Sequence, residues 1–152
     1  MTALLWLPII RVSVGSSAPA RASVDDAVEV DNPLTFKWPV GRLREVVLDH
    51  VTPGPVKLAY QTAGERGEPV VFIMGYGVPG RAWAEVATLI SSAHRAIWFD
   101  NRGIGLSDAP AGPYNMPQLA GDVANLIDHL DVDRVHLVGV SMGGMIAQEL
   151  VK

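Results

Sequence analysis

From residue 56 onward, short continuous apolar runs alternate with longer segments of mixed character. The runs Val70–Met74, Ala96–Phe99 and Val135–Val140 are typical of strands that are covered on both faces. Two further β-rich runs, Arg42–Val51 and Val56–Thr62, flank a Pro- and Gly-containing turn, so they are expected to form a strand pair. Strands that alternate with helices predict an α/β fold with a mostly parallel sheet and flanking helices.

Apolar residues that recur at helical spacing predict the helices between these strands. One helix is expected to begin near Arg81 and to bury Trp83, Val86, Leu89 and Ile90. A second helix is expected after Asn115, a good capping residue, and its apolar stripe comprises Leu119, Val123, Leu126, Ile127 and Leu130. A third helix is expected to follow Gly144.

Residues 1–40 differ from the rest of the chain. They lack clear periodicity and combine small, acidic and Pro-containing stretches, which is expected of a poorly ordered extension. The apolar run near the start and the small residues around Arg21 resemble a cleavable leader, but the first basic residue, Arg11, follows the run instead of preceding it. The sequence therefore predicts one domain at 41–152, preceded by an extension at 1–40, and a cytoplasmic location, with export as the alternative.

Composition narrows the classes of partner and chemistry. The 152 residues carry a net charge of −4 with no basic block, which argues against a nucleic-acid or anionic-lipid surface. No apolar run approaches the length of a membrane span. The absence of cysteine excludes disulfides, thiol nucleophiles and Cys-ligated zinc. The sequence leaves the oligomeric state open.

The segment Gly139-Val140-Ser141-Met142-Gly143 places a G-x-S-x-G pattern between a predicted strand and a predicted helix. Such a turn strains the backbone of the serine, and glycines two positions to either side avoid collisions with the neighbouring strand and helix. The serine hydroxyl would then project above the sheet, at the positive end of a helix. Ser141 is therefore a candidate nucleophile, and Gly139 and Gly143 are the glycines that permit the turn.

Two other motifs precede this turn in the sequence. They are the loop Met74-Gly75-Tyr76-Gly77 and the segment Asp100–Ser107, which reads D-x-R-G-x-G-x-S. Residues 42–152 resemble the α/β-hydrolase superfamily, and within it the branch of small serine esterases, lactonases and cofactor-free haloperoxidases. The prolyl aminopeptidases share the Asp100–Ser107 motif and stay open as an alternative.

The resemblance implies a serine hydrolase that cleaves a carboxylic ester or lactone through an acyl-enzyme and needs no metal or organic cofactor. Carried over by position, the backbone N–H groups of Tyr76 and Met142 would hold the oxyanion. The family usually has His-Gly where this chain has Met74-Gly75, so the usual hydrogen-bonded anchor of that loop does not carry over, although backbone amides can still bind the oxyanion. Dehalogenases and most epoxide hydrolases of the superfamily need a carboxylate at position 141, which disfavours them here.

Other conspicuous residues have structural interpretations. Asp100 and Arg102 are expected to shape their turn through an internal ion pair or backbone hydrogen bonds, and Ser107 is expected to act as a turn or cap residue. Trp83 and Trp98 are expected in the core, whereas Tyr76, at the mouth of the site, has a better claim than they do to line a substrate pocket.

The general base is missing from this pattern. The family order is nucleophile, acid and then histidine, yet the eleven residues after Ser141 contain Glu149 and no histidine. The four histidines, all before Ser141, fit structural roles: His50, His94, His129 at a helix end where a cation is favoured, and His136 buried in mid-strand. The chain therefore resembles the N-terminal part of a hydrolase and is expected to be inactive by itself. In such a partial domain, the strand 135–140 would lie at the edge of the sheet, without a neighbour on one side.

Several alternatives share this sequence pattern. Within the serine branch, aminopeptidase, carbon–carbon bond hydrolase and haloperoxidase-type perhydrolase activities remain open. An acyltransferase is a further possibility, and so is a non-catalytic binding protein on the same fold.

Overall fold

The computed structural model describes residues 9–13, 42–48 and 56–152. Its strands are β1 (Ile9–Ser13), β2 (Arg42–Leu48), β3 (Val56–Ala63), β4 (Pro69–Ile73), β5 (Arg95–Phe99) and β6 (Arg134–Gly139). Its helices are the 3-10 turn η1 (Gly80–Trp83), α1 (Ala84–Ile90), α2 (Met116–His129) and α3 (Met142–Leu150). The predicted strands and helices are confirmed to within a few residues. The predicted turn before residue 56, His50 and most of residues 1–40 lie outside the described residues.

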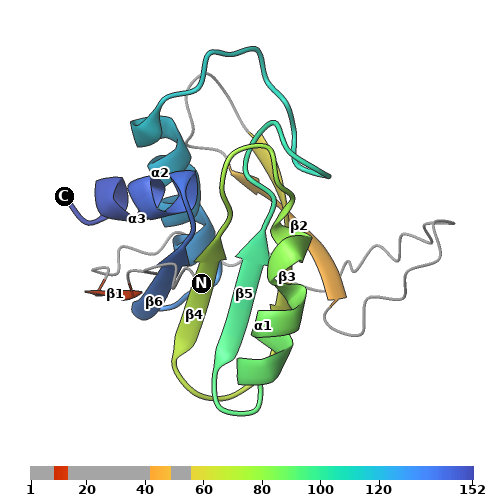
Figure 1. Ribbon diagram of the computed structural model, residues 1–152, viewed down its shortest axis with the longest axis vertical. Coiled ribbons are helices and arrows are strands. Elements are labelled where there is room, and N and C mark those ends of the chain that lie inside the picture. Colours follow the sequence, from red (N-terminus) through yellow and green to blue (C-terminus); the bar gives the residue numbers. More distant parts are fainter. Residues whose placement is uncertain (1–8, 14–41, 49–55) are drawn as a thin grey trace, which may run out of the picture.

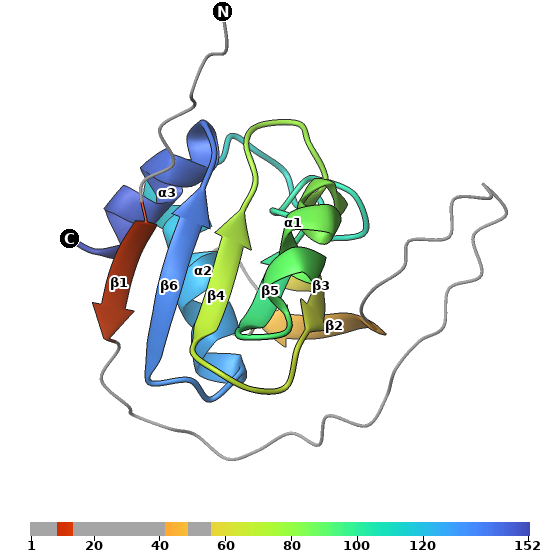
Figure 2. The same ribbon diagram turned by 60° about the horizontal axis from the view of Figure 1, so that its bottom comes forward.

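The strands form one mixed sheet in the order β1-β6-β4-β5-β3-β2 (Figures 1 and 2). β6, β4 and β5 run parallel, with β4 in the middle of the three. β3 pairs antiparallel with β5, and β2 pairs antiparallel with β3, as expected for the predicted strand pair. Because β4, β5 and β6 are parallel, the loops that follow them emerge at the same end of the sheet.

Helices cover both faces of the sheet (Figure 1). On one face, α2 and α3 pack over a core that includes Leu58, Val71, Leu126, Leu137 and Ile146. On the other face, η1 and α1 cover a smaller core around Phe72, Ala87 and Trp98. This layering explains why the strands read as continuous apolar runs, since both faces are buried.

The second helix has the predicted start and buried face. The Asn115 side chain accepts a hydrogen bond from the Gln118 backbone N–H (2.9 Å), and the Gln118 side chain accepts one from the Asn115 backbone N–H (3.1 Å). This capping box fixes the first turn of α2. The whole predicted stripe is buried: Leu119, Val123, Leu126, Ile127 and Leu130.

The predicted buried face of the first helix is partly wrong. Trp83 is buried, as expected, and its ring lies 5.1 Å from that of Phe72. Val86 and Leu89, however, are 41% and 79% exposed, and Ala84 and Ala87 are buried in their place. Small residues let this helix approach the sheet closely, so the larger apolar residues are turned outward.

The expectation of an uncovered edge at β6 is also wrong. β1 pairs antiparallel with β6 along its whole length, from Ile9 opposite Val138 to Ser13 opposite Arg134. Figure 2 shows β1 alongside β6, as the outermost strand of the sheet. The N-terminal residues therefore satisfy backbone groups that an edge strand would leave unpaired. The sequence analysis did not predict this strand, because residues 1–40 show no clear periodicity and the apolar run near the start resembles a leader.

The register of β1 can be tested by a disulfide, because the chain has no cysteine of its own. Arg11 lies opposite His136, and opposite residues in an antiparallel pair have Cα atoms about 4.5–5.5 Å apart, within the range of a disulfide. We expect Arg11→Cys with His136→Cys to oxidise readily to an intramolecular disulfide, detected by mass spectrometry after thiol alkylation.

The matched control is Ser13→Cys with Val138→Cys. Ser13 lies opposite Arg134, so this pair is four residues out of register, about 13 Å along the strand. Equal oxidation of the two pairs, or oxidation of the control alone, would contradict the register.

Candidate active site

Ser141 lies on the sharp turn between β6 and α3, at the end of the sheet where the parallel strands finish. Its backbone has φ 53° and ψ −121°, and Asp131 is the only other non-glycine residue with positive φ in the described part of the chain. The turn is closed by hydrogen bonds from the Gly143 N–H to the Val140 carbonyl and from the Gly144 N–H to the Ser141 carbonyl, both 2.9 Å. The predicted strained turn is therefore present.

The two predicted glycines are required by close packing. A Cβ on Gly139 would lie 2.4 Å from the carbonyl carbon and oxygen of Gly143. A Cβ on Gly143 would lie 2.1 Å from the carbonyl oxygen of Ile73, at the end of β4. Only glycine lets the start of α3 sit this close to both β6 and β4, and this contact fixes where Ser141 emerges.

The candidate oxyanion residues lie around this turn. Ser141 is exposed, and its side chain makes no hydrogen bond that caps α3. Met142 is the first residue of α3, where backbone N–H groups lack partners within the helix. On the other side, Gly75 approaches closely enough that a Cβ there would lie 3.3 Å from the Ser141 Cβ and 3.8 Å from its Oγ. Tyr76 follows Gly75 and is 83% exposed.

Sequence reasoning did not identify Gly75 as a contact of the candidate nucleophile. A larger residue at position 75 would make a tight contact with Ser141 and would require small shifts of its neighbours. The sequence did contain a sign of this contact, because a glycine directly follows the apolar run Val70–Met74. The roles of Ser141, Tyr76 and Met142 in catalysis stay predictions at this point.

Asp100 shapes its turn through backbone hydrogen bonds, as predicted. Its Oδ1 accepts a hydrogen bond from the Gly80 N–H (2.6 Å), and its Oδ2 accepts one from the Leu106 N–H (2.9 Å). The Ser107 hydroxyl donates to the Asp100 carbonyl (2.6 Å) and accepts from the Ala59 N–H of β3 (3.0 Å). Ser107 is therefore a buried structural residue that ties the loop to the sheet.

Arg102 forms an internal ion pair, but its partner is Asp122 of α2. The guanidinium donates two hydrogen bonds of 2.6 Å to the carboxylate, and both side chains are buried. Burial raises the pKa of Asp122, and Arg102 partly offsets this effect. Arg102 also lies over the ring of Tyr114, 5.7 Å from its centroid. The pair joins the loop after β5 to α2.

Trp83 and Trp98 lie in the core, as predicted. Trp83 and Trp98 are 7% and 1% exposed, respectively. The Trp98 indole N–H donates to the Gln61 side-chain oxygen (2.8 Å). Neither residue is on the loops that carry Ser141 and Gly75, so both act in packing the sheet.

His94 and His136 lie at the opposite end of the sheet from Ser141. His94 precedes β5, and His136 is near the start of β6, where its Nε2 is 2.6 Å from the Glu68 Oε2. This side chain is 23% exposed, so His136 is not buried as expected. His129 ends α2 just before β6 begins, and its Nε2 is 3.5 Å from the Tyr60 hydroxyl. Burial lowers the pKa of His129, against the expectation that the helix end favours its cation.

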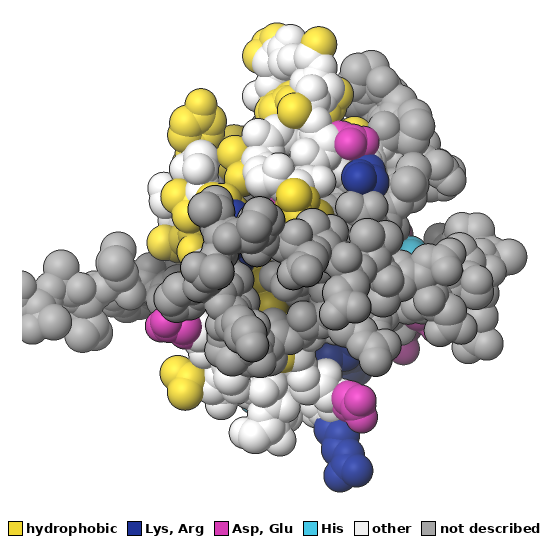
Figure 3. All heavy atoms as spheres, turned by 90° about the vertical axis from the view of Figure 1, so that its right-hand side faces the viewer, with side chains coloured by type: hydrophobic (Ala, Val, Ile, Leu, Met, Phe, Trp, Pro, Cys, Tyr) yellow, Lys and Arg dark blue, Asp and Glu magenta, His cyan; other side chains and the backbone are white. Residues whose placement is uncertain are grey.

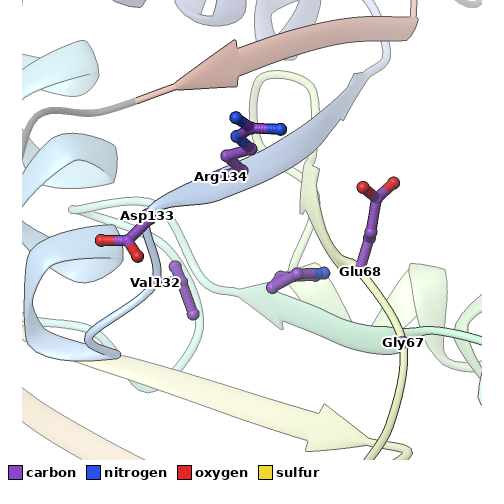
Figure 4. Close-up of a pocket in the computed structure, with 6 residues that line it drawn as sticks. Gly67, Glu68, Val132, Asp133 and Arg134 are labelled. Carbon is purple, nitrogen blue, oxygen red and sulfur yellow. The ribbon is translucent and has the colours of Figure 1, made fainter.

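A surface pocket lies at this same opposite end (Figure 4). It is lined by the loops that precede β4 and β6, through Gly67, Glu68, Pro69, Val132, Asp133 and Arg134. On the face shown in Figure 3, the described charged side chains are scattered and form no patch of one sign. Among the described residues, no group of three His, Asp or Glu side chains could hold a metal ion. None of the described helices is long and apolar enough to cross a membrane.

Comparison with known proteins identifies the family. The family model described as alpha/beta hydrolase fold matches residues 68–152, more than half of the chain. The chain therefore belongs to the α/β-hydrolase fold family, and the fold predicted from the sequence is confirmed.

Among curated relatives, a Mycobacterium tuberculosis protein that carries the name of a non-heme bromoperoxidase, BpoC, is 44% identical over 98 residues, or 63% of this chain. The 3-oxoadipate enol-lactonase 2 of Acinetobacter baylyi is 35% identical over 103 residues, or 67% of this chain. The chain spans 37% and 39% of the length of these two relatives.

Solved structures with this fold include a thermophilic esterase from Thermogutta terrifontis. It matches 70% of this chain and 40% of its own with a TM-score of 0.65 and 31% identity. An epoxide hydrolase from Vigna radiata matches 72% of this chain and 33% of its own, with a TM-score of 0.66 and 30% identity. The fold is thus shared by hydrolases of several reaction classes.

Replacement of Gly143 by alanine should destabilise the protein, because the new Cβ would collide with the backbone of β4. We expect a loss of about 2 kcal/mol or more in the free energy of unfolding, measured by urea denaturation. Gly121 in α2 is the control, since a Cβ there meets nothing within 4 Å. Gly121→Ala should stabilise by about 0.5–1 kcal/mol. Equal effects of the two substitutions would refute the packing argument.

Removal of one partner of the buried ion pair should cost more than removal of both. Asp122→Ala leaves the Arg102 guanidinium buried and unpaired, which typically costs about 3–5 kcal/mol of stability. In the double variant Arg102→Met, Asp122→Leu, apolar side chains replace both charges, so most of this loss should be recovered in urea denaturation. A double variant that is less stable than Asp122→Ala would show that the pair itself contributes net stability.

Proposed function

We propose that this chain provides the nucleophile and the oxyanion-binding backbone of a serine hydrolase that cleaves a carboxylic ester or a lactone. The observation that carries the proposal is the Ser141 turn. An exposed serine hydroxyl without a capping hydrogen bond stands on a strained backbone, and the Gly75 backbone packs against it. Such strain persists only where the surrounding structure imposes it, and it is often associated with functional sites.

In the proposed reaction, the Ser141 Oγ attacks the carbonyl carbon of the substrate while a general base accepts the hydroxyl proton. The carbonyl oxygen becomes an oxyanion, and the N–H groups of Tyr76 and Met142 donate hydrogen bonds to it. Collapse of this tetrahedral intermediate releases the alcohol, which takes up the proton, and leaves an acyl-Ser141 ester. Water then attacks the ester, and the carboxylic acid and the free serine are formed. This chemistry requires no metal or organic cofactor.

The base is the part that the described residues do not provide. His94 and His136 lie at the far end of the sheet, where both contact Glu68, and His129 at the end of α2 contacts the Tyr60 hydroxyl. A positioned base typically contributes about 10²–10⁴-fold to the rate. We therefore propose that residues 1–152 by themselves turn over esters slowly at most, and that a histidine with an acidic partner from elsewhere completes the site.

The relatives and the residue at position 141 support this reaction class over others. The similar proteins include one named as an enol-lactonase and one described as an esterase, and both names denote cleavage of carboxylic esters or lactones. Opening an epoxide through a covalent intermediate in this fold uses a carboxylate nucleophile, and position 141 is serine. Epoxide hydrolysis is therefore not proposed, despite the similarity to an epoxide hydrolase.

A second function would use the same acyl-enzyme. In perhydrolysis, hydrogen peroxide replaces water as the attacking group, and a peracid is released in place of the carboxylic acid. The similarity to the protein named as a non-heme bromoperoxidase favours this candidate. The two functions share Ser141 and the oxyanion donors, and product analysis with and without peroxide separates them.

A fluorophosphonate probe tests the nucleophile, because it phosphonylates an activated serine. Residues 1–152 should form one adduct at Ser141, located by peptide mass spectrometry, and Ser141→Ala should lose it. Added imidazole should accelerate labelling by about tenfold or more, since it replaces part of the contribution of a positioned base.

The control is Ser92→Ala, because Ser92 is an exposed serine on the loop that precedes β5. This variant should be labelled like the wild type. If Ser141 is not labelled with or without imidazole, or reacts no faster than other exposed serines, the enzyme proposal fails and a non-catalytic binding protein becomes the better explanation.

A further inference from the structure

The segment of residues 74–80, which we call the oxyanion loop, is held at both ends by two consecutive residues. At its start, the Asn101 side-chain amide donates a hydrogen bond to the Met74 carbonyl (3.1 Å). At its end, the Asp100 Oδ1 accepts a hydrogen bond from the Gly80 N–H (2.6 Å). Asn101 and Asp100 are 2% and 9% exposed, so water does not compete strongly for either bond. One dipeptide after β5 therefore fixes the loop after β4.

The dipeptide is itself held firmly. The Asp100 backbone N–H donates to the Ala59 carbonyl of β3 (2.9 Å), and its second carboxylate oxygen accepts from the Leu106 N–H. Gly105 packs against the same carboxylate so closely that a Cβ there would lie 2.0 Å from Oδ2. β5 also lies next to β4 in parallel register. A rigid strand end thus provides the reference point for the oxyanion loop.

Met74 is constrained on both its side chain and its carbonyl. Met74 is 9% exposed, and it belongs to the apolar cluster that includes Trp83. The carbonyl oxygen lies between the Asn101 amide and Gly143, where a Cβ would be 3.0 Å away. Because the peptide that joins Met74 to Gly75 is planar, the direction of this carbonyl also sets the direction of the Gly75 N–H and the path toward Tyr76.

We propose that Asn101 is a positioning residue that orients the oxyanion loop so that the Tyr76 N–H faces the substrate oxygen. The inference rests on the proposed serine hydrolase function. It also explains how the loop is anchored although Met74 stands where the family usually has histidine: an apolar side chain and the Asn101 hydrogen bond hold it together. Asn101 does not touch the substrate, and it acts through the Met74 peptide.

Two variants remove the hydrogen bond in different ways. Asn101→Ala deletes the donor, and Asn101→Asp keeps the shape but places a carboxylate oxygen toward the Met74 carbonyl. The matched control is Ser107→Ala, which also removes buried hydrogen bonds of the same loop, but to Ala59 and the Asp100 carbonyl instead of the oxyanion loop. A purely structural role would make the Asn101 variants behave like this control.

The first measurement is the rate of fluorophosphonate labelling of Ser141 in the presence of imidazole. Loss of a whole oxyanion donor typically costs about 10²–10³-fold, so misorientation of one donor should slow labelling by about 10–100-fold in both Asn101 variants. Ser107→Ala should stay within about threefold of the wild type when thermal unfolding confirms that it is folded.

The second measurement is backbone ¹⁵N relaxation, which does not depend on any reaction. In Asn101→Ala, the order parameters of Gly75, Tyr76 and Gly77 should fall, whereas those of Gly64 and Gly67 in the distant loop before β4 should not change. Unchanged loop order parameters in both Asn101 variants would overturn the proposal, as would labelling as fast as in Ser107→Ala. If the wild type is not labelled at all, the serine hydrolase function fails, and the relaxation data alone decide whether Asn101 holds the loop.

Discussion

The packing of three backbone segments around Gly139, Gly143 and Ile73 is the constraint on which the candidate site depends. Neither glycine has room for a Cβ, so α3 begins in direct contact with the ends of β6 and β4. The chain reaches this contact only by turning sharply at residue 141, which places a serine at positive φ. The cost of that conformation is offset by the cores on the two faces of the sheet, which hold the strands in register.

The parallel arrangement of β6, β4 and β5 brings further loops next to the Ser141 turn. Because these strands end at the same edge, the Ser141 turn, the oxyanion loop and the segment from Asp100 to Ser107 all meet there. Hydrogen bonds and an ion pair connect these loops to their neighbours. Asp100 and Asn101 bind the oxyanion loop, and the Arg102–Asp122 pair joins the loop after β5 to α2. His94 and His136 lie at the opposite end of the sheet, and His129 contacts Tyr60 at the end of α2, so none of the three is on the loops that meet at Ser141.

Sequence alone predicted the features that are encoded locally. The buried strands, the capped helix α2 and the Ser141 turn follow from short patterns of apolar residues, glycine and asparagine. The features that were not predicted, or were predicted wrongly, depend on distant partners or on size. Arg102 pairs with a residue twenty positions away, β1 adds to an edge more than a hundred residues later, and α1 turns small alanines inward. Asn101 was missed because only the folded chain brings it to the Met74 carbonyl.

The central claim is that the Ser141 Oγ and the N–H groups of Tyr76 and Met142 converge on one point. The most direct test is a crystal structure of this protein with Ser141 phosphonylated, because the phosphonyl oxygen occupies the position of the oxyanion. The account predicts that this oxygen lies about 2.7–3.1 Å from both backbone nitrogens. A phosphonyl oxygen that points away from them into solvent, or residue 141 in a regular helical conformation, would contradict it.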